Sequence, residues 1–94
     1  MADQPTMEVK VFAPFKTYFE GAAYSLSGLN DTGPFDILPH HKNFMSLLKP
    51  GNVVVRAPGK GELKLEVSRG VMHVRADKVT IFLDVENYLT SQAI

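Results

Sequence analysis

The sequence predicts an all-β fold, a sandwich or small barrel built from short strands. Apolar residues recur at every second position over most of the chain, which is the spacing of a strand with one buried face. Glycine and proline divide these segments at intervals of roughly ten residues, as they do in β-sandwiches. The 94 residues are 45% hydrophobic and 21% charged, which are ordinary values for one globular domain.

In the first half of the chain, Pro14 stops the first alternating segment, and Gly21 follows a second segment rich in β-forming residues. Small or apolar residues then alternate with polar ones before the densest group of turn-forming residues, and Pro39 closes the next apolar segment. We expect strands at 8–13, 17–19 and 22–27, a turn cluster at 28–34 and a short apolar segment at 35–38.

In the second half, residues 40–48 fit either one helical turn or a buried strand, and Pro50-Gly51 ends them. The glycines of 58–61 can adopt positive φ, which predicts a hairpin turn. The weak pattern of 86–94 fits a frayed tail or the start of a helix. We expect strands at 52–57, 62–67, 71–76 and 79–85.

Composition excludes several classes of function. The formal net charge is zero, which argues against nucleic acid as the main partner because phosphate binding needs a basic surface. The absence of cysteine excludes a disulfide framework, a thiolate zinc site and a cysteine nucleophile. No apolar run reaches the ~20 residues of a membrane helix, and residues 1–6 lack the order of a secretory signal, so we expect no direct membrane insertion.

Residues that could carry chemistry are few. His40 and His41 are adjacent and would point to opposite faces of a strand, which leaves His73 as the remaining imidazole for a metal site. Ser68 lacks the flanking glycines of a nucleophile elbow, and Lys60 lacks the spacing of a phosphate loop. We therefore expect no catalytic residue, no metal and no cofactor. A β-sandwich that binds a metal or small molecule through its histidines stays open as a minor alternative.

One loop stands out because it is cationic and lies between two apolar segments: Pro39-His40-His41-Lys42. Exposed loops on a rigid scaffold often carry binding residues. A solvated connector explains the same residues about equally well on physical grounds alone.

At this loop the order of the landmarks resembles a known family. The chain contains Phe19-x-Gly21, Phe35-Asp36-Ile37-Leu38-Pro39-x-His41, Lys49-Pro50-Gly51, Ser68-x-Gly70 and Val79-Thr80-x-x-x-Asp84. These motifs and their spacing are similar to those of the N-terminal β-sandwich domain of the F-type ATP synthase epsilon subunit, which is called delta in mitochondria. The resemblance covers about residues 8–86.

The resemblance implies a sandwich of about ten strands at the foot of the central stalk. It implies a peripheral position on the cytoplasmic side of the energy-transducing membrane, docked on the gamma subunit and on the polar loops of the c-ring. Such a domain transmits torque and couples proton transport to ATP synthesis without catalysis of its own. The partner-binding residues implied are Asp31, Gly33, Pro34, Asp36, Pro39, His40, His41 and Lys42.

The loop departs from the family pattern at several positions. Pro34 stands where the family has an acidic residue, and Asp36 could supply a carboxylate although we expect it to face the other way. His40 replaces a glycine, Lys42 follows the loop histidine where the family has alanine, and Arg69 replaces another glycine. The loop is therefore more cationic than usual, so either its partner carries compensating charge or the contact has changed.

The resemblance covers the sandwich alone, whereas the common bacterial subunit continues into two C-terminal helices. We therefore expect an N-terminal extension at 1–7, the sandwich at 8–86, a tail at 87–94 and no helical hairpin. Inhibition of ATP hydrolysis and ATP binding through those helices cannot be carried over.

Two further possibilities follow from the departures. The chain could be a free-standing epsilon-like binding or regulatory module with a changed partner. An isolated docking face could also associate weakly with a second copy. Under the rotor-stalk interpretation, Phe44 and Met45 are candidates for a partly exposed interface, and a place in the core is the alternative, more so for Phe44.

Overall fold

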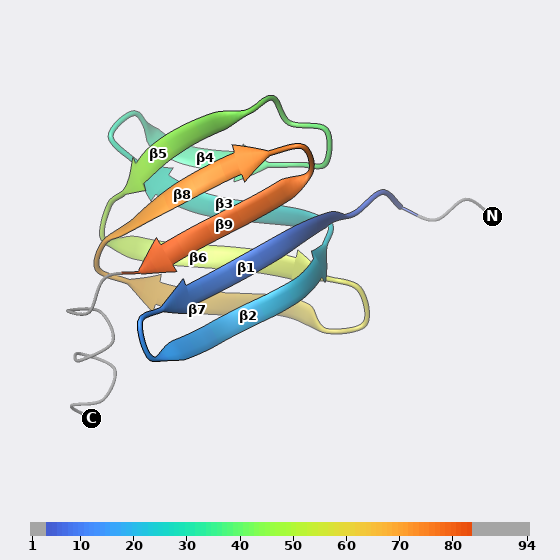
Figure 1. Ribbon diagram of the computed structural model, residues 1–94, viewed down its shortest axis with the longest axis horizontal. Coiled ribbons are helices and arrows are strands. Elements are labelled where there is room, and N and C mark those ends of the chain that lie inside the picture. The colour runs from blue at the N-terminus through green and yellow to red at the C-terminus, as the bar shows by residue number, and fades with distance from the viewer. Residues whose placement is uncertain (1–3, 84–94) are drawn as a thin grey trace.

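Two β-sheets pack face to face in the computed structural model, which describes residues 4–83 (Figure 1). One sheet has the strand order β2-β1-β9-β8-β5 and the other β4-β3-β6-β7. The strands of the described part are β1 (Met7–Ala13), β2 (Lys16–Ala23), β3 (Ser25–Asn30), β4 (Gly33–Ile37), β5 (Phe44–Leu48), β6 (Gly51–Ala57), β7 (Gly61–Val67), β8 (Gly70–Arg75) and β9 (Lys78–Leu83). The predicted all-β sandwich is confirmed. One pair departs from the antiparallel pattern, since β1 runs parallel to β9.

The core lies between the sheets and follows the period-two pattern of the sequence. In β1, Val9 and Val11 are fully buried while Glu8 and Lys10 between them are exposed. The same alternation fills the core from the other strands, with Leu26, Ile37, Val53, Val55, Met72, Val74, Val79, Ile81 and Leu83 among its buried members. Because side chains alternate across each strand, every sheet also presents an outer face.

The edge formed by β4 and β5 carries the turn at 31–32 and the segment 38–43. β4 is the edge strand of the four-stranded sheet and β5 is the edge strand of the five-stranded sheet. Segment 38–43 passes from one to the other, so it bridges the two layers at this edge, at the top of Figure 1.

The predicted strand at 22–27 is wrong, because the chain changes sheets inside it. β2 ends at Ala23 in one sheet and β3 begins at Ser25 in the other. Between them the Tyr24 amide donates a hydrogen bond to the Arg56 carbonyl over 2.7 Å. Ala23 and Ser25 are both buried, so the alternation continues across the corner and hides it in the sequence.

The predicted turn cluster at 28–34 is also too long. The turn itself is Asp31-Thr32, and Gly28 belongs to β3. The Phe35 ring packs over Gly28, where an added Cβ would lie 2.8 Å from the ring's Cζ atom. Glycine at this position therefore makes room for an aromatic ring and does not mark a loop.

The ambiguous stretch at 40–48 contains a strand, β5, and no helical turn. Phe44 packs partly against the core, and Met45 is 67% exposed on the other face. The predicted hairpin turn at 58–61 is confirmed, with Gly59 and Gly61 at φ 71° and 70°. The predictions for Asp84, for the end of the last strand at Val85 and for the tail lie outside the described residues.

Candidate partner-binding surfaces

The eight residues implied by the sequence lie in a line along the β4 edge, not in one cluster. Asp31 belongs to the turn before β4, Asp36 lies within β4, and His41 belongs to the loop after β4. Five strand residues separate the two ends, which corresponds to ~17 Å. The structure therefore brings Pro39, His40, His41 and Lys42 together in one loop, and places Asp31, Gly33 and Pro34 at the other end of the edge.

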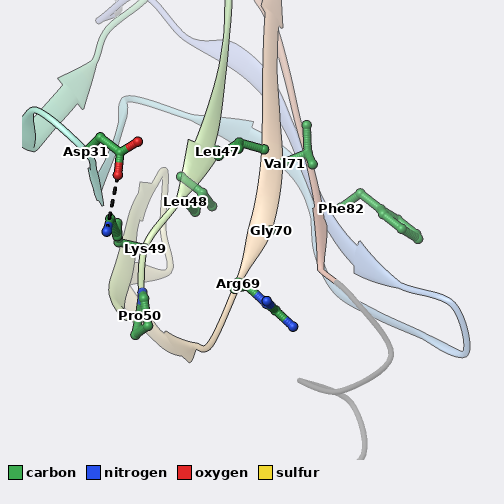
Figure 2. Close-up of a pocket in the computed structure, with 9 residues that line it drawn as sticks. All are labelled: Asp31, Leu47, Leu48, Lys49, Pro50, Arg69, Gly70, Val71 and Phe82. Atoms are coloured by element: carbon green, nitrogen blue, oxygen red, sulfur yellow. Dashed lines mark ion pairs between the residues drawn. The ribbon is translucent and has the colours of Figure 1, made fainter.

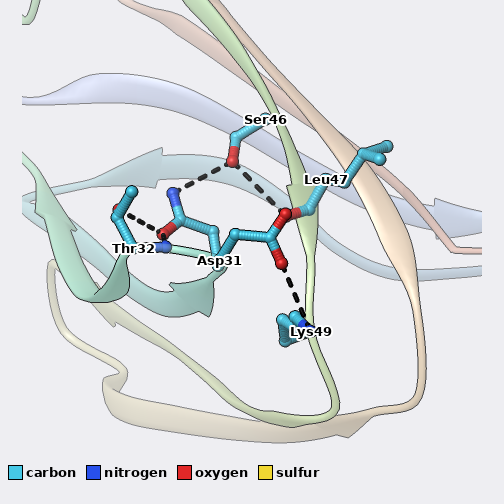
Figure 3. Close-up of polar contacts among 6 residues, drawn as sticks. Asp31, Thr32, Ser46, Leu47 and Lys49 are labelled. Atoms are coloured by element: carbon cyan, nitrogen blue, oxygen red, sulfur yellow. Dashed lines mark hydrogen bonds and ion pairs between the residues drawn. The ribbon is translucent and has the colours of Figure 1, made fainter.

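The turn before β4 is bonded to β5 and to Lys49, the residue that follows β5. The Asn30 side chain donates to the Ser46 hydroxyl over 3.0 Å and accepts from the Thr32 amide and hydroxyl (Figure 3). The Asp31 carboxylate forms an ion pair with Lys49 over 3.2 Å. Asp31 thus already has a partner within the chain, although both side chains are largely exposed.

The expectation that Asp36 faces away from the side of Pro34 is wrong. The two residues are two positions apart in β4, and both are exposed on its outer side. The Ser27 hydroxyl donates a hydrogen bond of 2.5 Å to the Asp36 carboxylate. A carboxylate is therefore available on the same side of the edge as Pro34.

The loop after β4 is held by the turn between β8 and β9. His40 has φ of 70°, the left-handed region that glycine adopts most readily. Its amide donates a hydrogen bond of 2.5 Å to the Asp77 carboxylate, and its Nδ1 atom lies 3.3 Å from the same carboxylate. The Ala76 amide donates to the Asn43 side chain over 3.1 Å. The contacts of Asp77 and Asn43 therefore stabilise the loop, in which His40 adopts a backbone conformation that is unfavourable for histidine.

The His41 side chain makes contacts different from those of the His40 side chain. Its ring packs against Phe44 with centroids 5.1 Å apart, and its Nδ1 atom lies 2.8 Å from the Lys42 carbonyl. Lys42 itself is exposed. The three histidines and nearby acids do not form a metal site, since residues 4–83 contain no group of three or more potential ligands placed to hold an ion.

A second surface, which the sequence interpretation missed, is an apolar row on the outer face of the five-stranded sheet. Leu47 is 67% exposed, Phe82 41% and Val71 38%. They lie opposite one another in register across β5, β8 and β9, and Phe12 of β1 extends the row. The Phe12 and Phe82 rings meet edge to face, with centroids 5.1 Å apart. We call these four residues the apolar row.

The apolar row continues into a cavity of about 520 Å³ at one end of the sheet. Figure 2 shows Leu47, Val71 and Phe82 beside it, with Leu48 and Pro50 on the β5 side. A large exposed apolar surface on one face of a small domain is typical of a protein interface. A sequence signal existed, because both members of the pairs 47–48, 71–72 and 82–83 are apolar, which indicates strands covered on both faces.

The part of the chain that the structure describes contains no helix with the length and apolarity needed to cross a membrane.

Comparison with known proteins gives one consistent result. Residues 6–86 match the family model described as ATP synthase, Delta/Epsilon chain, beta-sandwich domain. The chain is 36% identical over 80 residues to the ATP synthase epsilon chain of Neisseria meningitidis serogroup C, covering 84% of this chain and 57% of that protein. It is 35% identical over 78 residues to the ATP synthase epsilon chain of Brevibacillus brevis, covering 83% and 59%. The chain thus spans less than three fifths of the length of these two relatives.

Two solved structures share the fold. A chain of the Euglena gracilis mitochondrial ATP synthase, in a structure of OSCP, F1 and the c-ring, superposes with a TM-score of 0.77 at 18% identity, covering 87% of this chain and 53% of that one. A chain of the central stalk and c-ring of the Tetrahymena thermophila mitochondrial ATP synthase gives a TM-score of 0.71 at 20% identity, covering 88% and 66%.

Proposed function

This chain belongs to the ATP synthase delta/epsilon β-sandwich domain family, and on that premise we propose that it is a non-catalytic subunit of the rotor stalk of an F-type ATP synthase. In this role it docks on the gamma subunit and on the c-ring and couples proton transport to ATP synthesis. It sits peripherally on the cytoplasmic side of the energy-transducing membrane and needs no cofactor.

The observation that carries the proposal is the apolar row. Leu47, Val71 and Phe82 form one line across three strands and leave apolar surface in water that the fold itself does not use. Burial of such surface in a partner is favourable by about 25 cal/mol for each Å² removed from water. We assign this face to gamma, and the β4 edge with its loop 38–43 to the c-ring.

The loop assignment is supported by its rigidity. Because Asp77 of the neighbouring turn holds His40, and Asn43 of the loop accepts from the Ala76 amide of that turn, little conformational entropy is lost when a partner binds the loop. His41 and Lys42 are then presented in one arrangement on the side where the family motif places its partner-binding loop. Asp36 supplies the carboxylate that Pro34 lacks, on the same side of β4.

Co-purification with gamma and with the c-ring from the same source tests the proposal. The wild-type chain should form a stoichiometric complex with gamma. A variant with His41→Ala and Lys42→Glu should still bind gamma and lose recruitment to the c-ring. A folded wild-type chain that binds neither would overturn the assignment.

A second function, a free-standing binding module with a changed partner, is favoured by one observation. His40 occupies a left-handed backbone position where the family motif has glycine, and Asp77 holds it there. A folded chain that ignores gamma and retains a different partner through this loop would support this module.

A further inference from the structure

Two exposed cations lie directly opposite each other at the end of the five-stranded sheet. Arg75 of β8 and Lys78 of β9 are cross-strand neighbours in register. Like charges at such positions repel each other and destabilise the sheet. Within residues 4–83, neither side chain forms an ion pair, although Glu8 is the register neighbour of Lys78 on β1. No ion pair within the described residues therefore neutralises the two cations, although Glu8 and Glu20 line a hollow together with Lys78.

The next residues along the same strands extend this charge. His73 and Thr80 are cross-strand neighbours one step further along the outer face. Together with Arg75, Ala76 and Lys78 they line a hollow of about 440 Å³. Its side chains offer hydrogen-bond donors from an imidazole, a guanidinium, an ammonium and a hydroxyl, which suits an anionic group.

The Asp77 contacts join this hollow to the loop after β4. Asp77 lies between the two cations in the sequence and holds His40 through both the amide and the ring. Asn43 holds the Ala76 amide from the other side of the loop. All three histidines of the chain and three of its cations therefore gather at one corner: His40, His41, Lys42, His73, Arg75 and Lys78. We call this group the cationic corner.

Two other cations of the described residues, Arg56 and Lys49, are paired with carboxylates of the chain itself. Arg56 pairs with Glu62 over 3.0 Å, and Lys49 pairs with Asp31 over 3.2 Å. The formal charge of the whole chain is zero, so the cationic corner does not reflect a generally basic protein. The positive charge of the corner is local, and local charge complementarity contributes to the choice of partner.

We propose that the cationic corner binds a carboxylate-bearing loop of a protein partner. In the assembly proposed above this partner is the set of polar loops of the c-ring, and that identification rests on the proposed function. A protein is favoured over an anionic membrane because the corner contains three lysine or arginine residues, whereas lipid-binding clusters commonly contain about four to eight. Glu8 and Asp77 beside the corner further disfavour a flat anionic surface.

The first test does not depend on the ATP synthase. Hexaglutamate peptide is titrated into the isotopically labelled chain, and amide chemical shifts are followed by NMR. The shifts should concentrate at Lys42, Arg75 and Lys78 and should weaken as salt is added, since the attraction is screened. Shifts spread evenly over the surface, including the four-stranded sheet, would overturn the proposal.

Matched substitutions sharpen this test. Lys78→Glu should weaken peptide binding about fivefold or more, and Lys64→Glu, an exposed lysine of the other sheet, should change it less than about twofold. Lys78→Gln separates loss of charge from reversal of charge and should fall between the two. Equal effects of Lys78→Glu and Lys64→Glu, with both variants folded by thermal unfolding, would contradict the inference.

The second test uses the purified c-ring in detergent and vesicles of phosphatidylcholine with phosphatidylglycerol. Binding to the c-ring that is lost in Lys78→Glu and kept in Lys64→Glu supports both proposals. Peptide shifts at the corner without any c-ring binding would keep the acidic protein partner and reject the stalk assignment. Binding to the anionic vesicles that exceeds binding to peptide and c-ring, and depends on Lys78, would overturn a protein partner.

Discussion

The two outer faces of the sandwich differ in how far their exposed side chains are bonded to other side chains of the same chain. On the four-stranded sheet, Arg56 bonds to Glu62 and to the Ser25 hydroxyl, and Asp36 accepts from Ser27. On the five-stranded sheet, the apolar row lies in water at one end and the cationic corner at the other. Both faces belong to strands with the same period-two core pattern, so the needs of folding alone do not explain the difference.

The hairpin turns of the two sheets differ in a similar way. The turn between β6 and β7 places Gly59 and Gly61 at positive φ, where glycine is free of steric cost. The turn between β8 and β9 places Ala76 and Asp77 there, at φ 50° and 62°. The second turn accepts a conformational cost, and Asp77 uses its position to hold the loop after β4. Unsatisfied surface and strained backbone thus occur in the same sheet, which is the sheet whose outer face we propose for partner binding.

The largest expected effect is on gamma binding. Phe82→Glu places a charge in the middle of the apolar row and should weaken gamma binding by about 2–4 kcal/mol, because a central aromatic anchor is lost and a carboxylate must be desolvated. Isothermal titration calorimetry with purified gamma measures this.

The matched control is Val54→Glu, at a partly exposed position on the outer face of the four-stranded sheet. It should leave gamma affinity within about 0.5 kcal/mol of wild type. If both variants bind gamma equally well, the apolar row is not the docking face and the contrast between the faces has another cause.

The next effect concerns the strained turn. Asp77→Ala removes the acceptor of the His40 amide and should destabilise the chain by about 1–2 kcal/mol, a value reduced for partial exposure of the carboxylate. Lys60→Ala in the other hairpin turn should cost less than about 0.5 kcal/mol, since it loses a weak contact with the Phe19 ring. Urea unfolding of both variants gives the comparison. Faster amide exchange at His40 and His41 in Asp77→Ala, and not in Lys60→Ala, would confirm that the loop is released.

Substitution of the turn residues in opposite directions should give effects of opposite sign. Ala76→Gly relieves a left-handed alanine and should stabilise the chain by about 0.5–1 kcal/mol, with its amide bond to Asn43 kept. Gly59→Ala introduces the same cost in the other turn and should destabilise by about 1 kcal/mol. Equal signs in thermal unfolding would show that the two turns do not differ in backbone strain.

The sequence predicted the fold class and the β4 loop well, for physical reasons. The alternation of Val9, Val11 and their neighbours is itself the cause of the two-layer core, so it can be recognised without a structure. The sequence prediction was wrong at Tyr24, where the chain changes sheets without breaking the alternation, and at Gly28, where glycine makes room for Phe35. Both errors concern contacts between segments, which local pattern does not contain.

The candidate surfaces also differ in whether one stretch of sequence is enough to recognise them. His41 and Lys42 could be proposed from the sequence because a loop between apolar segments is visible in one stretch, and their role stays a prediction. The apolar row was missed, and so were Arg75 and Lys78 of the cationic corner, because both depend on the register of several strands. Asp77 is absent from the residues proposed from the sequence, and its contact with His40 spans 37 positions in the chain. Sites assembled by sheet register need the strand order before they can be recognised.

The smallest expected effect tests the charge contrast directly in the free chain. Arg56→Ala should destabilise by about 0.5 kcal/mol, since its ion pair with Glu62 is half exposed and screened. Arg75→Ala should have no cost or should stabilise by a few tenths of a kcal/mol, because removal of one of two opposed cations relieves their repulsion. Thermal unfolding at low salt should show the difference, and about 1 M salt should remove most of it. A clear loss of stability in Arg75→Ala would mean that the guanidinium stabilises the fold. The repulsion between Arg75 and Lys78 would then no longer support a partner-binding role for the cationic corner.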